Sequence, residues 1–561
     1  MGFIDRVVNA VSPETALKRA KARHETINLE AQSEALLAKL KILGTVIPPP
    51  PTSGQTAVTN SGYSHGGASR RRTWAKEWNS ESGSARSDIE ENRKLLRERS
   101  RDLFMNAPLA TGAVKSSRTS CIGPGLMPKP KIDYEFLGMT KEEADKLQRL
   151  IKKEFAIWAE STLCDSSDLN NFYELQQVAF TDWLNNGEEF VLIKYEKQLK
   201  YMPYQLRISL VEADRVCTPG SLDGSYDGYD KKAKNGNSII NGIETDKSGK
   251  VVAYHIASRF PGEYGSGSLK WASVKKRGAK TGNPNILHIF NAERAGQYRG
   301  VPLLAPVIQT LKQLTRYTEA EIMAAVVNSL FGIFITTKTG EQIEGFGGDG
   351  EEAEEKTGDA KDEDDDKIKV GTGTVTFLKE GEEVKAVESA HPSNNYDAFV
   401  NSMALQIGAA LEIAPEVLLK KFSNNFSASK GALNETWKSF KMYRRWFIDD
   451  FCQEIYVLWF NEAVSKGRIN APGYFNNILV KKAYTNATWN GPAQGHLNPV
   501  QEVTAAIQKI QNGLSTHEDE CISMNGSDYE DNIRTLKTEN ILLAEAQAGN
   551  TAGRNKNGGK D

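Results

Sequence analysis

The sequence predicts an α+β fold, because strand patterns occupy the middle of the chain and long helical patterns the part after residue 300. Between about 188 and 290, short β-type runs alternate with turns rich in Gly and Asp. Leu303–Ser329 and Ser427–Ser465 instead carry apolar residues at helical spacing. With 561 residues, 25% of them charged and 9% aromatic, the chain has the composition of a folded protein and the length of about three to four compact units.

Residues 1–69 are expected to form an N-terminal helix followed by a flexible linker. Apolar residues recur at helical spacing up to about residue 43. Four consecutive prolines, Pro48–Pro51, then open a stretch rich in Gly, Ser and Thr that extends to Ser69. Such a composition cannot bury much apolar surface. The compact body is therefore expected to begin near Arg70.

The segment 70–300 is expected to be helical first and rich in strands afterwards. Ile89–Met105 has the pattern of a basic amphipathic helix, with an apolar face of Leu95, Leu96, Leu103 and Phe104 opposite Arg93, Lys94, Arg97, Arg99 and Arg101. Two more helices are expected at Lys141–Glu160 and Phe172–Asn185. Strands are expected at Phe190–Tyr195, Gln205–Val211, Val251–Ile256 and Ile286–Phe290.

After residue 300 the chain is expected to be mainly helical. The helix Leu303–Ser329 would be roughly 40 Å long. A second helix is expected at Tyr396–Leu411, and Ser427–Ser465, the strongest helical pattern of the chain, has a stop signal in Gly467. We expect a further helix at Pro499–Asn512 and a disordered tail after about Leu543.

Charge is segregated along the chain, although the total formal charge is only -2. Residues 341–366 contain thirteen acidic residues and two lysines, a net charge of -11 that leaves +9 on the rest of the chain. The near-neutral total gives no global attraction to nucleic acid or to an anionic membrane. Any contact with DNA must therefore be local.

The sequence motifs support neither catalysis nor a bound cofactor or metal. The GxSxG match at 62–66 lies in the linker rather than between a strand and a helix, and the GxGxxG match at 345–350 leads into the acidic run. The sequence contains no GxxxxGK[ST] loop, no HxxxH or HExxH pair and no CxxC pair. We therefore expect a protein that is not an enzyme, with no cofactor and no metal site.

The sequence also predicts no membrane span and no secretory signal. The longest apolar stretch, Ile322–Ile335, has 14 residues and is interrupted by Asn328 and Ser329, whereas a membrane span needs about 20. The first residues lack a basic region followed by an unbroken apolar stretch. The five cysteines are far apart in sequence, which fits a reducing compartment, so synthesis in the cytoplasm is expected.

Short fragments in a fixed order resemble one known family. They are RDLFMNA (101–107) with IGPGL (122–126), FYELQQ (172–177) before NGEEFV (186–191), LVEADRV (210–216), NGIE (241–244) before VAYHI (252–256), HIF (288–290) before GQYRGVP (296–302), and NYDAF (395–399) leading through IGAALEI (407–413) to FSASK (426–430). Over about residues 85–515 the chain resembles the lambda-type portal proteins of tailed bacteriophages. The N-terminal helix, the acidic insert and the tail lie outside this resemblance.

The resemblance implies a ring, usually dodecameric, at the one capsid vertex through which double-stranded DNA is packaged and ejected. The family's parts would divide the chain into a wing (70–300), a stem helix (301–334), a clip with the acidic insert (335–392), a returning stem helix (393–412), a tunnel loop (413–426), a long tunnel helix (427–467), a crown (468–542) and a disordered tail (543–561). The implied partners are further copies of the chain, the terminase large subunit, the major capsid and scaffolding proteins, and head-tail adaptor proteins. The protein would be made in the host bacterial cytoplasm and reside at the head-tail junction.

Three groups of residues are candidates for contact with DNA or with the packaging machinery. The tunnel loop would face the lumen with Lys420, Lys421, Ser423, Asn424 and Asn425, although ordinary surface lysines remain an equal alternative. Lys312 and Arg316 are secondary candidates on the stem helix. The acidic clip insert, with Glu351, Glu352, Glu354, Glu355, Asp362, Glu363, Asp364, Asp365 and Asp366, would either repel DNA or offer a charged surface to partners, unless it is only a solvated loop.

Two other classes of protein stay open. A structural adaptor or scaffold protein of the virion would also lack a catalytic site, but it would not need two long helices on either side of an insert. A nucleic-acid enzyme would need a carboxylate or histidine cluster in one pocket, which the sequence does not indicate.

Overall fold

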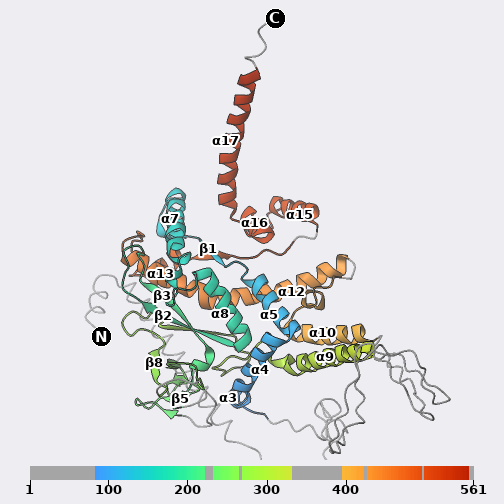
Figure 1. Cartoon of the computed structure of the whole chain (residues 1–561). Helices are drawn as coiled ribbons and strands as arrows, with labels where there is room; N and C mark the ends of the chain where they lie inside the picture. Colours follow the sequence, from blue (N-terminus) through green and yellow to red (C-terminus); the bar gives the residue numbers. More distant parts are fainter. Residues whose placement is uncertain are drawn as a thin grey trace, which may run out of the picture. The chain divides into compact units, whose positions relative to one another are not determined.

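The computed structural model describes residues 82–220, 231–263, 268–330, 395–422, 426–495 and 498–554. The chain divides into two compact units, and the described residues from Gly83 onward belong to the second. The expected N-terminal helix and linker, the clip with its acidic insert, and Ser423, Asn424 and Asn425 of the tunnel loop lie outside the described residues. Figure 1 shows the helices and strands of that second unit, coloured from blue to red along the sequence.

The first part of this unit is mainly helical, as the sequence predicts. Its helices are α3 (Ala85–Glu90), α4 (Arg93–Asn106), α5 (Pro108–Cys121), α6 (Tyr134–Leu137), α7 (Lys141–Ala159) and α8 (Phe172–Asn186). Capping boxes start α7 and α8, because the N-cap side chain of Thr140 or Asn171 and the glutamate three residues later satisfy each other's backbone N–H groups. Gly187, with a φ of +86°, ends α8 and turns the chain into a strand.

The expected single helix at Ile89–Met105 is wrong in two respects. A turn at residues 91–92 separates α3 from α4. The expected polar face is also incorrect, because Arg93 and Arg97 are only 3% and 1% exposed, whereas Leu95 is 45% exposed. Burial of these two arginines requires acidic partners from another part of the chain.

The strands form three antiparallel sheets within the described residues. Their bounds are β1 (Met127–Pro130), β2 (Glu188–Tyr195), β3 (Leu206–Val211), β4 (Lys231–Lys232), β5 (Ser238–Ile240), β6 (Ile243–Thr245), β7 (Val251–Ala257), β8 (Trp271–Lys275), β9 (Ile286–Phe290) and β10 (Ala487–Asn490). The orders are β1-β10, β3-β2-β9 and β4-β5-β6-β7-β8. The expected strand-rich region is confirmed, but it forms two sheets, with β9 returning to β2 rather than to β8.

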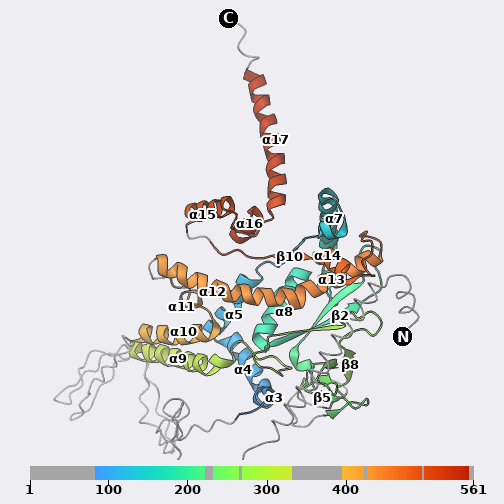
Figure 2. The same ribbon diagram turned by 180° about the vertical axis from the view of Figure 1, so that it is seen from behind.

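Helices α9 (Ile308–Leu330) and α10 (Tyr396–Leu411) lie side by side in both views (Figures 1 and 2). The ring of Tyr317 on α9 packs against Tyr396 and Phe399 on α10, with centroids 5.8 Å and 4.6 Å apart. Helix α10 has the predicted bounds. Helix α9 begins five residues later than expected, after the 3₁₀ turn Ala305–Val307, because the prolines at 302 and 306 interrupt regular hydrogen bonding.

The expected long helix at Ser427–Ser465 is continuous but changes its geometry once. After the short helix α11 (Pro415–Leu418), it consists of α12 (Phe426–Phe447), a π-helical segment at Ile448–Cys452 and α13 (Gln453–Ser465). Its aromatic side chains form much of the core, with Phe447 against Phe180, Phe451 against Phe172, and Trp459 against Phe155 at ring distances of 5.5, 5.8 and 5.0 Å. The π-helical segment therefore lies where the helix is buried against α7 and α8.

The C-terminal part contains α14 (Ile478–Thr485), α15 (Pro499–Gln511), α16 (His517–Asn525) and α17 (Tyr529–Arg554). Helix α17 extends to Arg554, past residue 543, where the sequence predicts a disordered tail. Lys129 on β1 forms ion pairs with Glu518 and Asp528, and Lys152 on α7 pairs with Asp528 and Asp531 at 3.3 and 2.5 Å. These pairs hold α16 and the start of α17 against the earlier part of the chain.

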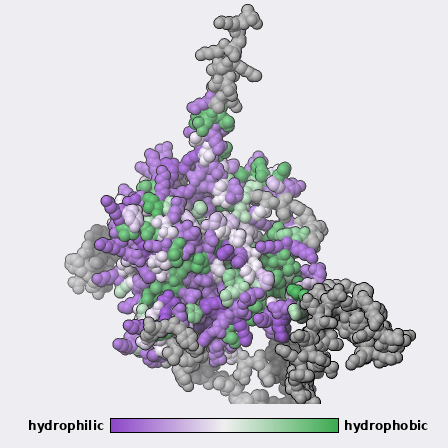
Figure 3. Space-filling view, in the orientation of Figure 1, coloured by the Kyte–Doolittle hydropathy of each residue, from purple (hydrophilic) through white to green (hydrophobic). Residues whose placement is uncertain are grey.

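The face that Figure 3 shows is mainly hydrophilic, with smaller hydrophobic patches among the polar residues. Among the described helices, none is both long and apolar enough to cross a bilayer.

Candidate functional site

A group of buried charged side chains joins α4, β2, β9 and the segment after β9. Glu188, the first residue of β2, is fully buried and accepts hydrogen bonds from Arg97 at 2.6 Å and from Arg299 at 2.8 Å. Its other oxygen accepts from His288 Nε2 at 2.9 Å and from the backbone N–H of Gly300 at 3.1 Å. One carboxylate thus holds four segments together, and we call it and its partners the Glu188 centre.

The electrostatics of this centre are dominated by two arginines. Burial alone would favour the neutral form of Glu188, but Arg299, with His288 and Arg97, outweighs it and holds the carboxyl pKa well below its usual range. Burial lowers the pKa of His288, so the neutral imidazole donates to Glu188. Glu188 therefore carries a negative charge, which two buried guanidinium groups share.

Arg299 and Asp214 extend the centre to neighbouring strands and turns. The guanidinium of Arg299 donates to the backbone carbonyls of Val216 and Ala213 at 2.8 and 2.9 Å, and to that of Asn241. Asp214 accepts from Arg97 at 3.0 Å and from Arg101 at 2.5 Å. These donors and acceptors are thus used within the protein, which is the arrangement of a structural ion network rather than of a reactive site.

Two glycines beside the Glu188 centre, Gly187 and Gly300, lie where the backbone leaves no room for a side chain. A Cβ on Gly300 would lie 1.9 Å from the carbonyl oxygen of Gly187, and one on Gly187 would lie 2.4 Å from the backbone of Val301. Distances below 3.0 Å require the backbone to move. The two glycines thus allow the chain after β9 to pass directly beside the start of β2.

A second group of carboxylates lies next to the first. Glu189 is buried, and its side-chain oxygens have no hydrogen-bond partner among the described residues. Burial, together with the charge of Asp182, raises the pKa of Glu189 well above its usual range. Burial and the charge of Glu212 raise the pKa of Asp182 to about 6. The raised pKa favours the neutral form of Glu189, which avoids an unpaired buried charge.

The structure places Lys420 and Lys421 at the exposed start of the expected tunnel loop. Helix α11 ends at Leu418, and Lys420 adopts a φ of +54° as the chain turns. The backbone N–H of Lys421 closes this turn by donating to the carbonyl of Glu416 at 3.1 Å. The ammonium of Lys421 lies 3.4 Å from Asp397 on α10, so part of its charge is offset. Both lysine side chains are exposed.

Lys312 and Arg316 lie one turn apart on the exposed side of α9. Lys312 is 60% exposed and is 3.7 Å from Asp102 of α4. Lys312 and Arg316 are carried by α9, whereas Lys420 and Lys421 follow the end of α11. The candidate cations thus form two separate exposed pairs rather than one built site.

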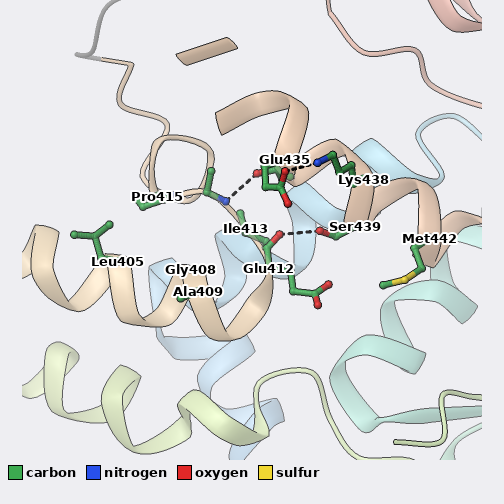
Figure 4. Close-up of a pocket in the computed structure, with 12 residues that line it drawn as sticks. Leu405, Gly408, Ala409, Glu412, Ile413, Pro415, Glu435, Lys438, Ser439 and Met442 are labelled. Carbon is green, nitrogen blue, oxygen red and sulfur yellow. Dashed lines mark hydrogen bonds and ion pairs between the residues drawn. The ribbon is translucent and has the colours of Figure 1, made fainter. Parts of the chain in front are cut away.

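An open pocket of about 520 Å³ lies between α10, α11 and α12 (Figure 4). Glu412 ends α10 with a φ of +56°, and its carbonyl accepts from Ser439 on α12 at 3.0 Å. The N–H of Ala414 donates to Thr436 at 2.8 Å. The polar side chains around the opening, Glu412, Glu435 and Lys438, include one ion pair of 2.6 Å. These bonds fix the start of the loop that carries Lys420 against α12.

Within the described residues, no group of three His, Cys, Asp or Glu side chains is arranged to hold a metal ion. Asp449 pairs with Arg445 at 2.8 Å, and burial with the charge of Asp449 raises the pKa of Asp450 to about 6.

Sequence reasoning missed two sets of residues that organise these regions. Asp397, which offsets Lys421, is 24 residues away in sequence, and no local pattern connects the two. The sequence shows members of the Glu188 centre only in separate fragments that resemble the portal family, and it does not indicate that they meet. These members are Arg101, Glu188, Asp214 and Arg299. Charged residues within otherwise apolar fragments were the sequence feature that could have indicated buried charges.

Comparison with known proteins identifies the family. Residues 71–444 match the family model described as phage portal protein, lambda family. The match covers more than half of the chain. This chain belongs to the lambda family of phage portal proteins.

Two relatives of this chain are portal proteins, and the alignment with each covers most of both chains. The portal protein of Escherichia phage N15 is 22% identical over 491 residues, covering 85% of this chain and 90% of that protein. Portal protein B of Escherichia phage lambda is also 22% identical, with 85% and 89% covered. Among solved structures, a chain of the virion of a native gene transfer agent particle aligns over 77% of this chain and 92% of its own, with 9% identity and a TM-score of 0.33.

Membership confirms the family predicted from the sequence. A portal protein is a structural component of the phage virion, and its relatives are portal proteins rather than enzymes. The Glu188 centre and the aromatic core around α12 and α13 both involve residues within the matched range.

Replacing Glu188 by Gln is expected to lower the free energy of unfolding by about 3–5 kcal/mol, because it leaves Arg299 buried without its ion-pair partner and Arg97 with Asp214 alone. Since the pKa of Glu188 is depressed, this stabilisation is present above the unfolded pKa of about 4.3 and is lost as the pH falls further. Urea unfolding followed by tryptophan fluorescence measures both effects. The control Glu98→Gln removes a 55% exposed carboxylate 4.0 Å from Lys94 and should change stability by less than about 0.5 kcal/mol.

Replacing Glu189 by Gln is expected to stabilise the protein at pH 8 by about 1–3 kcal/mol and to have little effect near pH 4. The folded pKa of Glu189 is raised, so the native protein loses stability as the pH rises from the unfolded value of about 4.3 through the folded one. The glutamine variant lacks this loss. Equal effects of the substitution at both pH values would contradict the raised pKa of Glu189.

Proposed function

We propose that this chain forms the portal ring of a tailed bacteriophage, a closed dodecamer at the unique capsid vertex. The ring is the conduit for double-stranded DNA during packaging and ejection, and the docking platform for terminase and the head-tail connector proteins. The observation that carries the proposal is the family match over residues 71–444, which includes both α9–α10 and the first part of the long helix α12–α13.

In this proposal the elements take the family's roles in chain order. Residues 70–300 are the wing, α9 descends as the stem, residues 335–392 are the clip and α10 is the returning stem helix. The loop 413–426 faces the lumen, α12 and α13 are the tunnel helix, and residues 468–542 are the crown. The tight packing of α9 on α10 and the aromatic burial of α12–α13 support rigid walls for such a channel.

The tunnel loop supplies a weak ring of cations in this proposal. A DNA duplex carries one negative charge per ~1.7 Å, so a strongly basic lumen would hold it too firmly for sliding. Lys420 and Lys421 are exposed, and Asp397 offsets part of the charge of Lys421. Ser423, Asn424 and Asn425 add neutral polar groups, and Lys312 and Arg316 provide secondary contacts on the stem. Few and partly neutralised cations suit a conduit.

The acidic insert takes the clip position in this proposal. Its carboxylates, repeated around the ring, repel DNA at the mouth or present a charged surface to the terminase large subunit and the adaptor proteins. The major capsid and scaffolding proteins contact the outside of the ring. The sequence has no GxxxxGK[ST] loop, so the proposal assigns the nucleotide-driven motor to another chain.

The ring is tested first by mass. Twelve subunits of 62.0 kDa give about 744 kDa by light scattering, and end-on electron micrographs should show a hole wide enough for a duplex of about 20 Å. A compact dimer would favour a structural adaptor, and nuclease activity would favour an enzyme. Subunits that remain monomeric are mixed with scaffolding protein before the mass is read, and failure to form rings then would overturn the proposal.

Replacing both loop lysines, as Lys420→Asn with Lys421→Gln, is expected to weaken retention of linear duplex DNA in the ring by about threefold to tenfold at low salt. Asn is chosen at 420 because it tolerates the positive φ of that position. The readout is filter binding between 50 and 200 mM salt. The control, Lys146→Gln with Lys153→Gln, removes the same charge from exposed positions of α7 and should have little effect. A control effect as large as that of the loop variant would refute the lumen assignment.

A further inference from the structure

The five-stranded sheet β4–β8 brings separate parts of the chain together at one end of its strands. Its neighbouring strands are antiparallel throughout, from β4 to β8 in chain order. In such a meander the turn after β4, the turn after β6 and the chain leaving β8 all lie at the same end of the sheet. The connections after β5 and β7 lie at the opposite end.

That shared end is strongly basic. It carries eight exposed cations, which we call the basic end: Lys232, Lys234, Lys247, Lys250, Lys275, Lys276, Arg277 and Lys280. None of the eight forms an ion pair with another described residue. The two bonds that their side chains do make are to neutral groups, from Lys232 to Ser238 at 2.9 Å and from Arg277 to the carbonyl of Gly282 at 3.1 Å.

The acidic residues at this end are occupied within the sheet. Glu244 is buried and accepts from Asn235 and Asn237 at 2.8 and 2.7 Å, with His255 at 3.1 Å. Asp246 accepts from the backbone N–H groups of Ser248 and Lys250 and so shapes the β6–β7 turn. These carboxylates organise the turns, and the charge of Asp246 acts on Lys250. The eight cations outnumber these two carboxylates.

The cations lie close enough to repel one another. The backbone N–H of Lys276 donates to Val252 at 2.9 Å, which places Lys276 beside the turn that contains Lys250. Partial burial of its ammonium lowers the pKa of Lys276, and the charges of Arg277 and Lys250 lower it further. An anion bound here would relieve this repulsion.

The basic end has no apolar centre. Among the described residues from 231 to 284, no large hydrophobic side chain is exposed. Protein interfaces normally have an apolar or aromatic core within a polar rim, whereas the DNA phosphate backbone is bound by charge alone. Four strand spacings of about 4.8 Å also make the end roughly 19 Å wide, close to the width of a duplex. These features favour a nucleic acid over an acidic protein.

We propose that the basic end of the β4–β8 sheet is a second DNA-binding site, which holds the phosphate backbone of double-stranded DNA without sequence specificity. The site lies at residues 232–250 and 275–280, separate in sequence from the loop 413–426, and it does not need DNA to pass through a ring. A subunit bound to DNA at this site holds duplex that is outside the channel.

The topology of the DNA probe separates this site from a channel. A covalently closed circular plasmid cannot thread a preformed ring, so its binding reports only an external surface, whereas a linear duplex can enter the lumen. The test measures plasmid binding by the full-length protein between 50 and 200 mM salt. We expect binding that weakens steeply with salt.

The variant Lys275→Gln, Lys276→Gln, Arg277→Gln is expected to bind the plasmid about tenfold more weakly and to reduce the salt slope by roughly 2–3. The control Lys146→Gln, Arg149→Gln, Lys153→Gln removes the same number of exposed cations from α7 and should change binding less than twofold. A second variant, Lys247→Gln with Lys250→Gln, tests the neighbouring turn, and tryptophan fluorescence checks the fold of each variant.

Three results would overturn the proposal: no plasmid binding by the native protein, equal losses in the control, or displacement of plasmid by polyglutamate as effectively as by duplex at equal charge. The last result would indicate an acidic protein partner. None of these outcomes bears on the ring, which is judged by its mass and by the loop variant of Lys420 and Lys421. Normal plasmid binding by a protein that forms no ring would support this site and contradict the conduit.

Discussion

The buried negative charge of Glu188 is the constraint on which this part of the fold depends. Two guanidinium groups, an imidazole and a backbone N–H converge on one carboxylate, and they come from α4, from β9 and from the segment that follows it. The three-stranded sheet β3-β2-β9, α4 and the passage towards α9 are thereby fixed together. Helix α9 in turn supports α10, whose end and following turn bond to α12. The position of Lys420 thus follows from a series of contacts that starts far from the loop.

The sequence was sufficient for the elements with strong periodicity. The bounds of α10 and the extent of α12–α13 agree with the helical patterns, because a continuous apolar stripe on a long helix has no competing interpretation. The π-helical segment at Ile448–Cys452 leaves that stripe almost unchanged, so sequence periodicity does not reveal it. The family followed from the order of short fragments, each of which alone is uninformative.

The sequence was insufficient where charges are buried or where partners are distant. Arg93 and Arg97 have the spacing of a solvated helix face, and only their acidic partner nearly a hundred residues later makes burial possible. Asp397 near Lys421 is a similar case. The basic end of the β4–β8 sheet depends on strand order, since residues from three separate segments meet only once the meander is folded. Sequence patterns within one segment carry no information about contacts between distant segments.

The sequence separation of its members gives the Glu188 centre a consequence for synthesis. A ribosome releases Arg97 long before Glu188, and Glu188 long before Arg299 and Gly300. Until residue 300 has emerged, the carboxylate has only part of its partners and the start of β2 lacks the chain that passes beside Gly187. Contacts of such long separation form late, because loop closure must precede them. During synthesis the contacts of Glu188 and of the start of β2 therefore stay incomplete. They can be completed only after the segment leading into α9 has been made.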